Sequence, residues 1–172
     1  MQLLHRYLLE ERKELIDQKI RLNVIGQVGR LPIFVRRPLR KLCSDTSGHH
    51  EMTLTLALSY GSRAEIVDAV KSVAQKVKQG RMRVEDIDEH VFGSNLQTAG
   101  LPDPDLLIRT SGEHRLSNFL LWQLAYSELY ISDLAWPDFR RPQLEEALED
   151  FAGRERRYGK TSAQLKKGDT DD

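Results

Sequence analysis

The sequence predicts an α/β fold in which a mostly parallel sheet is flanked by helices. Segments that read as strands alternate along the chain with segments whose apolar residues recur at helical spacing, and this alternation is typical of parallel sheets. The chain has 172 residues, of which 40% are hydrophobic, so it is long enough to bury one core. Few strands are expected, which makes the sheet thin for this class.

Composition excludes several classes of protein. Lys plus Arg is 26 and Asp plus Glu is 26, and this balance argues against a general electrostatic nucleic-acid binder. Cys43 is the single cysteine, so no intrachain disulfide can form and a reducing compartment is expected. No apolar run approaches the roughly 20 residues that span a bilayer, and the N-terminus lacks a signal-peptide layout. We therefore expect a cytoplasmic globular protein with no nucleic-acid partner.

The first elements are a helix, a strand and a second helix. The first helix begins almost at Met1 with no capping residue before it, which we interpret as an indication that the chain starts inside a larger architecture. Alternating residues then predict a strand that stops at Gly26, followed by a helix over residues 31–47 that is entered at Pro32. The basic side chains of this second helix form either a solvated face or a contact for phosphate or a membrane surface. They are Arg36, Arg37, Arg40 and Lys41.

The remaining elements continue the alternation. A strand over residues 52–60 precedes a helix for which Ser62 is the expected N-cap and Glu65 occupies the capping-box position. We assign residues 1–159 to one domain and residues 160–172 to a polar, frayed tail. The other predicted elements are a short helix at 85–92, a strand at 106–110, an apolar helix at 117–127, a short strand at 130–132, a break at 136–139 and a helix at 143–158.

The densest polar cluster, residues 109–118, follows the strand at 106–110. In open α/β sheets, ligands bind beyond the carboxyl ends of strands. Arg109 and Arg115 carry guanidinium groups suited to phosphate oxygens, and Gly112 lets the backbone approach a ligand closely. Ser117 is expected to cap the next helix, whose N-terminus would favour an anion. These residues predict a phosphate or diphosphate pocket.

A purely structural role for both arginines is the alternative, since acids lie close to them in the sequence. These acids are Asp103, Asp105 and Glu113. Glu128, which follows the apolar segment, could ligate a hard cation such as Mg²⁺ or form a salt bridge at the rim. His114 could serve as acid, base or ligand, or could simply form hydrogen bonds in a polar loop.

The run over residues 105–130 closely resembles the signature of the cis-prenyltransferases, the family of undecaprenyl diphosphate synthase. Residues 59–63 are similar to the family's Asn-Tyr-Gly-Gly-Arg turn but depart from it at Ser59 and Ser62. Three further segments, at 21–26, 136–139 and 154–159, also match the family's pattern. The resemblance covers nearly the whole chain apart from the tail.

This resemblance implies an isoprenyl transferase that adds isopentenyl diphosphate to an allylic diphosphate such as farnesyl diphosphate and makes cis double bonds. It also implies Mg²⁺ held by Glu128 and His114, a homodimer, an apolar tunnel between sheet and helices, and a peripheral membrane contact through the lipid product. Arg157 and Gly159 are expected to reach a diphosphate in the partner subunit. The residues expected to bind the diphosphate of isopentenyl diphosphate are Arg109, Arg115, Leu116 and Ser117.

The family's first third has no counterpart in this sequence. Its Asp-Gly-Asn-Gly-Arg-Trp segment supplies a metal-binding aspartate, and no Asp-Gly-Asn occurs here. We therefore assign no catalytic residue to this chain, expect its sheet to lack the family's first strands, and expect little or no activity from the chain alone. The alternatives are a non-catalytic subunit of a heteromeric enzyme and a plain anion-binding fold without turnover.

One geometric conflict concerns Ser117 and Glu128. On an unbroken helix, residues so far apart in sequence stand roughly 16 Å from each other, too far for one diphosphate–metal cluster to touch both. Either the helix breaks between them, or Glu128 reaches the site from another direction, such as across a dimer.

Overall fold

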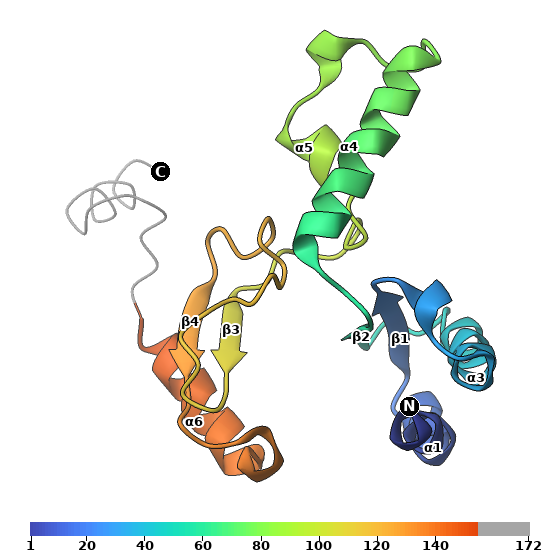
Figure 1. Ribbon diagram of the computed structural model, residues 1–172. Coiled ribbons are helices and arrows are strands. Elements are labelled where there is room, and N and C mark those ends of the chain that lie inside the picture. The colour runs from blue at the N-terminus through green and yellow to red at the C-terminus, as the bar shows by residue number, and fades with distance from the viewer. Residues whose placement is uncertain (155–172) are drawn as a thin grey trace, which may run out of the picture. The chain divides into compact units, whose positions relative to one another are not determined.

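The computed structural model describes residues 1–154 and contains two compact units, one spanning Met1–Leu101 and one that begins at Pro102 (Figure 1). Each unit contains one pair of parallel strands. The α/β class and the parallel pairing predicted from the sequence are confirmed. Within the described residues, however, the strands form two separate two-stranded sheets.

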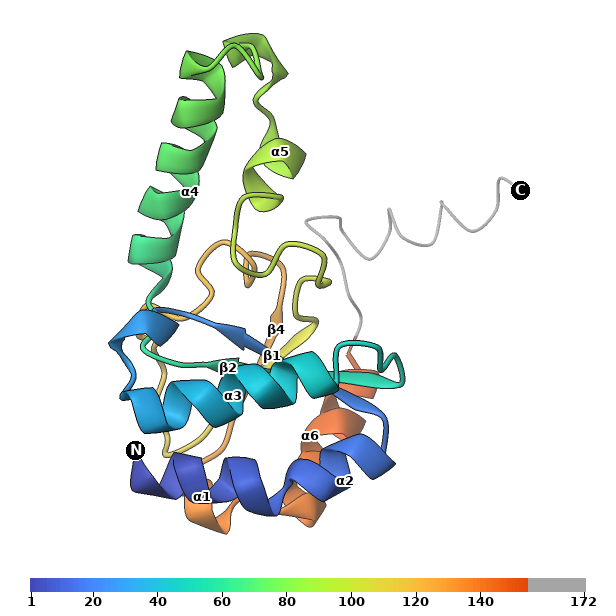
Figure 2. The same cartoon turned by 90° about the vertical axis from the view of Figure 1, so that its right-hand side faces the viewer.

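The first unit is built around strands β1 (Ile20–Ile25) and β2 (Met52–Ala57), which pair in parallel from Ile20↔Met52 to Ile25↔Ala57. Helix α3 (Ile33–Asp45) connects the two strands and packs on β1 and on α1 (Gln2–Glu10), as Figure 2 shows. The apolar faces of these elements form one core because each helix buries its apolar stripe. The core residues include Leu8, Leu22, Val35, Leu39 and Leu42.

A buried threonine fixes the end of α3 against the strand. Thr46 is fully buried, and its hydroxyl accepts the Leu22 N–H (3.0 Å) and donates to the Leu42 carbonyl (2.8 Å). The hydroxyl thus satisfies the Leu22 N–H of β1 in the core, while the Leu42 carbonyl also accepts the Thr46 backbone N–H (3.0 Å).

Several helix boundaries differ from the sequence prediction. The N-terminal helix is divided into α1 and α2 (Arg12–Asp17). Helix α4 (Ser62–Lys78) begins at Ser62 with Gly61 as its N-cap, so the predicted Ser62 cap was wrong. The short helix predicted at 85–92 consists of a 3₁₀ turn (Val84–Asp86) and α5 (Glu89–Gly93).

In the second unit, β3 (Leu106–Arg109) pairs in parallel with β4 (Glu128–Ile131), from Leu106↔Glu128 to Arg109↔Ile131. A 3₁₀ turn (Trp136–Asp138) and helix α6 (Arg141–Ala152) follow. Helix α6 ends at Ala152, before the end predicted for it, and residues 155–158 lie outside the described part of the chain.

The apolar helix predicted at 117–127 is wrong. This segment is a series of turns, and Ser117, Asn118 and Leu120 have positive φ angles of 49°, 63° and 44°. Left-handed residues cannot continue a right-handed helix, so the hydrogen-bond ladder cannot form across them. Leu120 and Leu124 are nevertheless buried, so the apolar pattern reports burial and not helical structure. In the described residues, no helix has the length and apolar character needed to cross a bilayer.

Candidate functional site

Arg109, the last residue of β3, carries the clearest sign of a ligand site in the second unit. Its Nε is buried and has no hydrogen-bond partner among the described residues. The backbone around it is held firmly, because Ser132 N–H donates to the Arg109 carbonyl (2.8 Å) and Ser111 N–H donates to the Leu134 carbonyl (2.8 Å). A buried N–H of a permanent cation is costly to leave unpaired, so this position favours an anionic acceptor.

The loop after Arg109 favours glycine at position 112. Gly112 has φ +61°, and a Cβ there would lie 3.2 Å from Asp133 Oδ1. Its N–H donates to the Ser132 carbonyl (2.9 Å), which ties the loop to the chain that follows β4. Backbone hydrogen bonds and the nearby Asp133 side chain therefore fix the path of the loop away from the sheet.

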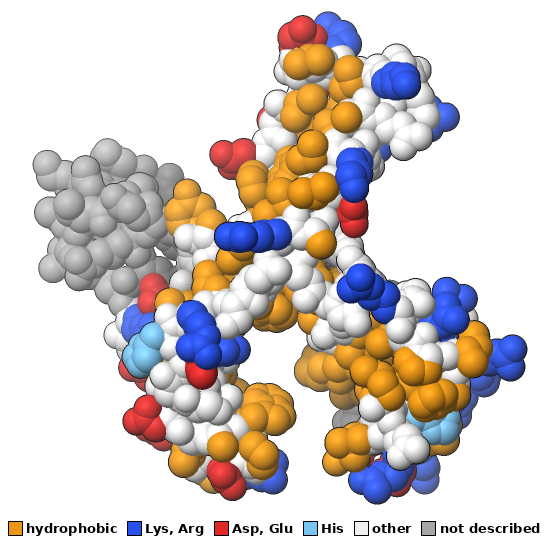
Figure 3. All heavy atoms as spheres, in the orientation of Figure 1, with side chains coloured by type: hydrophobic (Ala, Val, Ile, Leu, Met, Phe, Trp, Pro, Cys, Tyr) orange, Lys and Arg blue, Asp and Glu red, His pale blue; other side chains and the backbone are white. Residues whose placement is uncertain are grey.

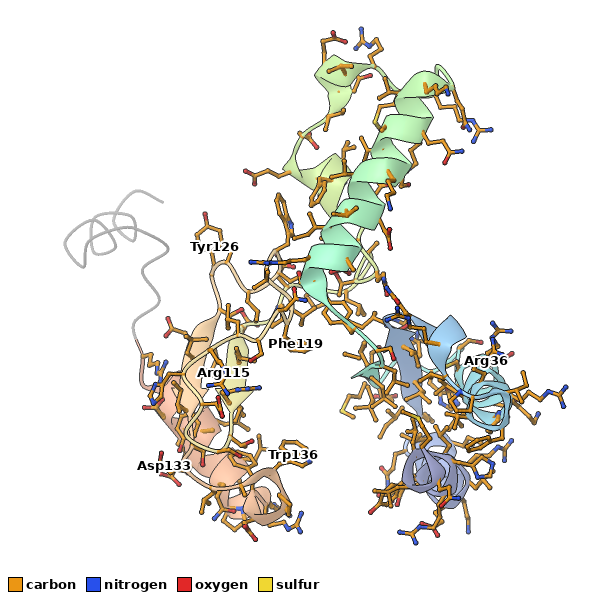
Figure 4. All side chains as sticks on the ribbon, in the orientation of Figure 1. Arg36, Arg115, Phe119, Tyr126, Asp133 and Trp136 are labelled. Atoms are coloured by element: carbon orange, nitrogen blue, oxygen red, sulfur yellow. The ribbon has the colours of Figure 1, made fainter. Side chains whose placement is uncertain are left out.

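Arg115 has a different environment, because its guanidinium forms an ion pair with Glu113. This is one of the acids that the structural alternative named. The Arg115 side chain is 69% exposed, whereas that of Glu113 is 29% exposed. A diphosphate bound by Arg115 would take the place of the Glu113 carboxylate and would have to compensate for this ion pair. Figure 4 labels Arg115 in this loop, with Asp133 and Trp136 in the chain that follows β4.

Ser117 does not cap a helix, so the anion site predicted at a helix N-terminus is absent from the described residues. Its side chain is exposed in a left-handed turn, while the neighbouring Leu116 carbonyl accepts the Phe119 N–H (3.0 Å). Ser117 remains available as a hydroxyl close to Arg115 in sequence. Further along the loop, Tyr126 points away from the strands (Figure 4).

Glu128 lies at the amino end of the strand pair, opposite Leu106, whereas Arg109 lies at the carboxyl end. Three residues of strand separate these ends by about 10 Å. The Glu128 carboxylate accepts a hydrogen bond from Arg154 (2.9 Å), and this bond raises the pKa of the guanidinium. Arg154 also bonds Asp150 (2.5 Å). The structure thus gives Glu128 a salt-bridge partner and does not bring it to Arg109.

The second predicted metal ligand, His114, is exposed in the loop. Within residues 1–154, no group of three or more His, Cys, Asp or Glu side chains is arranged to hold a metal ion. Carboxylate oxygens suit Mg²⁺, and the assignment of Glu128 and His114 as its ligands stays a prediction. Arg157 and Gly159, expected to reach a partner's diphosphate, lie outside the described residues.

A polar network that the sequence analysis missed lies at the carboxyl end of β1 and β2 in the first unit. Glu65 is only 2% exposed and accepts hydrogen bonds from the Tyr60 hydroxyl (2.5 Å) and the Gln97 N–H (2.9 Å). The Gln97 side chain in turn accepts the Gly26 N–H (2.5 Å). No sequence signal links Gln97 to residues so distant in the chain.

The chain is similar to known prenyl-chain enzymes over most of its length. Residues 1–159 match the family described as "Putative undecaprenyl diphosphate synthase". The chain is 51% identical over 166 residues to an isoprenyl transferase of Chlorobaculum tepidum, with 96% of this chain and 63% of the relative covered. It is 49% identical over 165 residues to that of Geobacter sulfurreducens, covering 96% and 67%. The chain thus spans slightly less than two thirds of the first relative's length.

Two solved structures share the fold. Lavandulyl diphosphate synthase from Lavandula x intermedia, solved in complex with dimethylallyl diphosphate, has a TM-score of 0.90 and 38% identity, with 93% of this chain and 70% of that chain covered. A probable undecaprenyl diphosphate synthase from Campylobacter jejuni has a TM-score of 0.77 and 33% identity, covering 92% and 72%.

Proposed function

Because the chain belongs to the undecaprenyl diphosphate synthase family, we propose that it serves the condensation of isopentenyl diphosphate with an allylic diphosphate such as farnesyl diphosphate, forming a cis-polyprenyl diphosphate. In this reaction a carbon–carbon bond forms, the allylic carbon–oxygen bond breaks with release of diphosphate, and the isopentenyl unit loses a proton. The part assigned to this chain is the binding of the isopentenyl diphosphate headgroup.

The observation that carries the proposal is the unpaired, buried Nε of Arg109 at the carboxyl end of β3. Arg115, Leu116 and Ser117 follow in the loop after β3, and the exposed Arg115 side chain could exchange its Glu113 partner for a ligand. Two guanidinium groups and a hydroxyl suit a diphosphate, and holding that group would position the isopentenyl double bond for attack on the allylic carbon.

Isothermal titration with isopentenyl diphosphate tests this binding role. Arg115→Ala should weaken binding at least about tenfold, because one charge-assisted hydrogen bond contributes about 1.5–3 kcal/mol. Arg141→Ala is the matched control, since Arg141 is an exposed arginine on α6 paired only with Glu145 in the described residues. Equal affinities for the two variants would contradict the assignment.

We propose further that this 172-residue chain alone has little or no turnover. Support comes from the missing Asp-Gly-Asn sequence and from the lack of a three-ligand metal group among residues 1–154. The Mg²⁺ dependence, with Glu128 and His114 as ligands, stays a prediction, because Glu128 would first have to leave Arg154. Product formation from both diphosphates and Mg²⁺ at a rate normal for a complete isoprenyl transferase would refute the proposed inactivity.

The second candidate function is a diphosphate-binding subunit or fragment without catalysis. It is favoured by the same unpaired Arg109 together with the missing metal group. Supplying the family's Asp-Gly-Asn-Gly-Arg-Trp segment on a co-expressed N-terminal fragment separates the two functions. Restored turnover supports the enzyme, whereas binding of isopentenyl diphosphate without turnover supports the subunit.

The proposed assembly is a cytoplasmic homodimer in which Arg157 and Gly159 serve the partner subunit's site, with the lipid product as a route of membrane contact. Exposed apolar side chains in the second unit support an interface there, and Trp136 is 71% exposed. The others include Leu129, Leu134, Leu144 and Leu148. Sedimentation of a monomer across the micromolar range would contradict the dimer.

A further inference from the structure

The basic residues of helix α3 and the turn before it are not used by the proposed diphosphate site. Every charged residue from position 18 to position 44 is a cation, although the chain as a whole has no net charge. This local excess places positive charge on one element of the first unit. The cations on α3 and its preceding turn are Arg30, Arg36, Arg37, Arg40 and Lys41.

The structure shows which face of α3 carries this charge. Val35, Leu39 and Leu42 point into the core, so the opposite face is exposed. That face combines cations with two apolar side chains, Ile33 (54% exposed) and Phe34 (45% exposed). Figure 3 shows Lys and Arg side chains beside hydrophobic ones on the body formed by α1 and α3, and Figure 4 labels Arg36 on α3.

Most of the cations on this face are not neutralised. Within the described residues, Arg30, Arg37 and Arg40 form no ion pair. Lys41 approaches Asp45 (3.4 Å), but this carboxylate is also bound by Arg12 (2.8 Å) at the C-terminal end of α3. The unpaired cations therefore extend from the turn before α3 to Arg40, on both sides of the exposed apolar side chains Ile33 and Phe34.

Elements packed against α3 add little negative charge at the N-terminal end of α3. Helix α1 contacts α3, and its residues from Met1 to Leu9 include no acid. His5 of α1 meets Phe34 edge-on, with ring centroids 5.7 Å apart. The first acid of α1, Glu10, is held by Arg6 (3.6 Å).

We propose that this face of α3 is a docking surface for an anionic lipid bilayer. Arg30, Arg37 and Arg40 would contact the headgroups, and Ile33 and Phe34 would enter the boundary with the acyl chains. A nucleic acid would use the cations but would leave Ile33 and Phe34 in water. The apolar pair therefore favours the bilayer over nucleic acid. This contact is made by the protein surface itself and is separate from any contact through a lipid product.

Co-sedimentation with vesicles tests the proposal on the full chain. Binding should rise with the fraction of phosphatidylglycerol in phosphatidylcholine vesicles and should fall steeply as salt is added. The double variant Arg37→Glu/Arg40→Glu should bind at least tenfold more weakly, and Phe34→Ser should also bind more weakly at a fixed lipid composition. Lys71→Glu/Lys78→Glu on α4 makes the same charge change elsewhere and should bind like the parent chain.

Three results would overturn the proposal. One is the absence of binding to phosphatidylglycerol vesicles by the parent chain, whose fold is verified by circular dichroism. Another is an equal loss in the α3 and α4 double variants, which would indicate a response to net charge alone. The third is tighter binding to a random-sequence RNA than to the vesicles, with Phe34→Ser unchanged, which would identify the face as a nucleic-acid surface.

Discussion

Replacing Glu65 should destabilise the first unit more than any exposed acid does. Its carboxylate is buried and accepts hydrogen bonds from the Tyr60 hydroxyl and from the Gln97 backbone N–H. In Glu65→Leu, these donors lose their acceptor. The bond from the Gln97 N–H is part-buried, and a hydrogen bond to a charged group contributes about 1.5–3 kcal/mol.

The Tyr60 hydroxyl belongs to a half-buried side chain, so it can find water and adds about 1 kcal/mol. The expected loss for Glu65→Leu is therefore about 2–4 kcal/mol of unfolding free energy. Glu65→Gln keeps an acceptor oxygen and the side-chain shape, and should lose about half of this amount. Tyr60→Phe should lose only its own bond, and combining it with Glu65→Leu should cost little more.

Urea unfolding monitored by circular dichroism measures these differences, and hydrogen exchange at the Gln97 amide locates them. Asp68→Asn is the matched control, because this exposed acid of α4 only approaches Lys71 (3.5 Å) and should change stability by less than about 0.5 kcal/mol. If Glu65→Leu were as stable as Asp68→Asn, the network would not hold the strand ends to α4.

Three further outcomes follow from single contacts in the first unit. Thr46→Val removes the acceptor of a buried backbone N–H and should cost about 1–3 kcal/mol in urea unfolding, whereas Thr46→Ser should recover most of it. Gly26→Ala should cost at least about 2 kcal/mol, since φ is +104° and its Cβ would lie 2.1 Å from a backbone oxygen; a parent-like melting temperature would contradict this. The hydrogen bond from Arg12 lowers the pKa of Asp45 from 3.8, so its stabilisation is present above that pH and is lost as the pH falls through the lowered value. Melting temperatures measured across this acidic range should therefore fall less steeply in Asp45→Asn.

The helices and strands of this protein could be predicted from the sequence because each depends on the pattern of apolar residues within its own segment. Alternating apolar residues mark β1, and helical spacing marks α3 and α4, since each pattern reports which face of one element is buried. Alternation of these elements also predicted parallel pairing, because parallel strands need a long connection between them. The position of Arg109 at a strand end follows from the same reasoning.

The contacts that decide how the site works join residues from different elements, and no pattern in the sequence encodes them. Glu128 meets Arg154, and Glu65 meets Gln97, only after the backbone has brought distant segments together. The turns over 117–127 show the same dependence, because apolar residues favour burial in either a helix or a turn. The sequence alone therefore determined the order of elements, their buried faces and the family, whereas the tertiary structure decided which charges are paired. Burial is a property of each residue, but a hydrogen bond or ion pair depends on the positions of two.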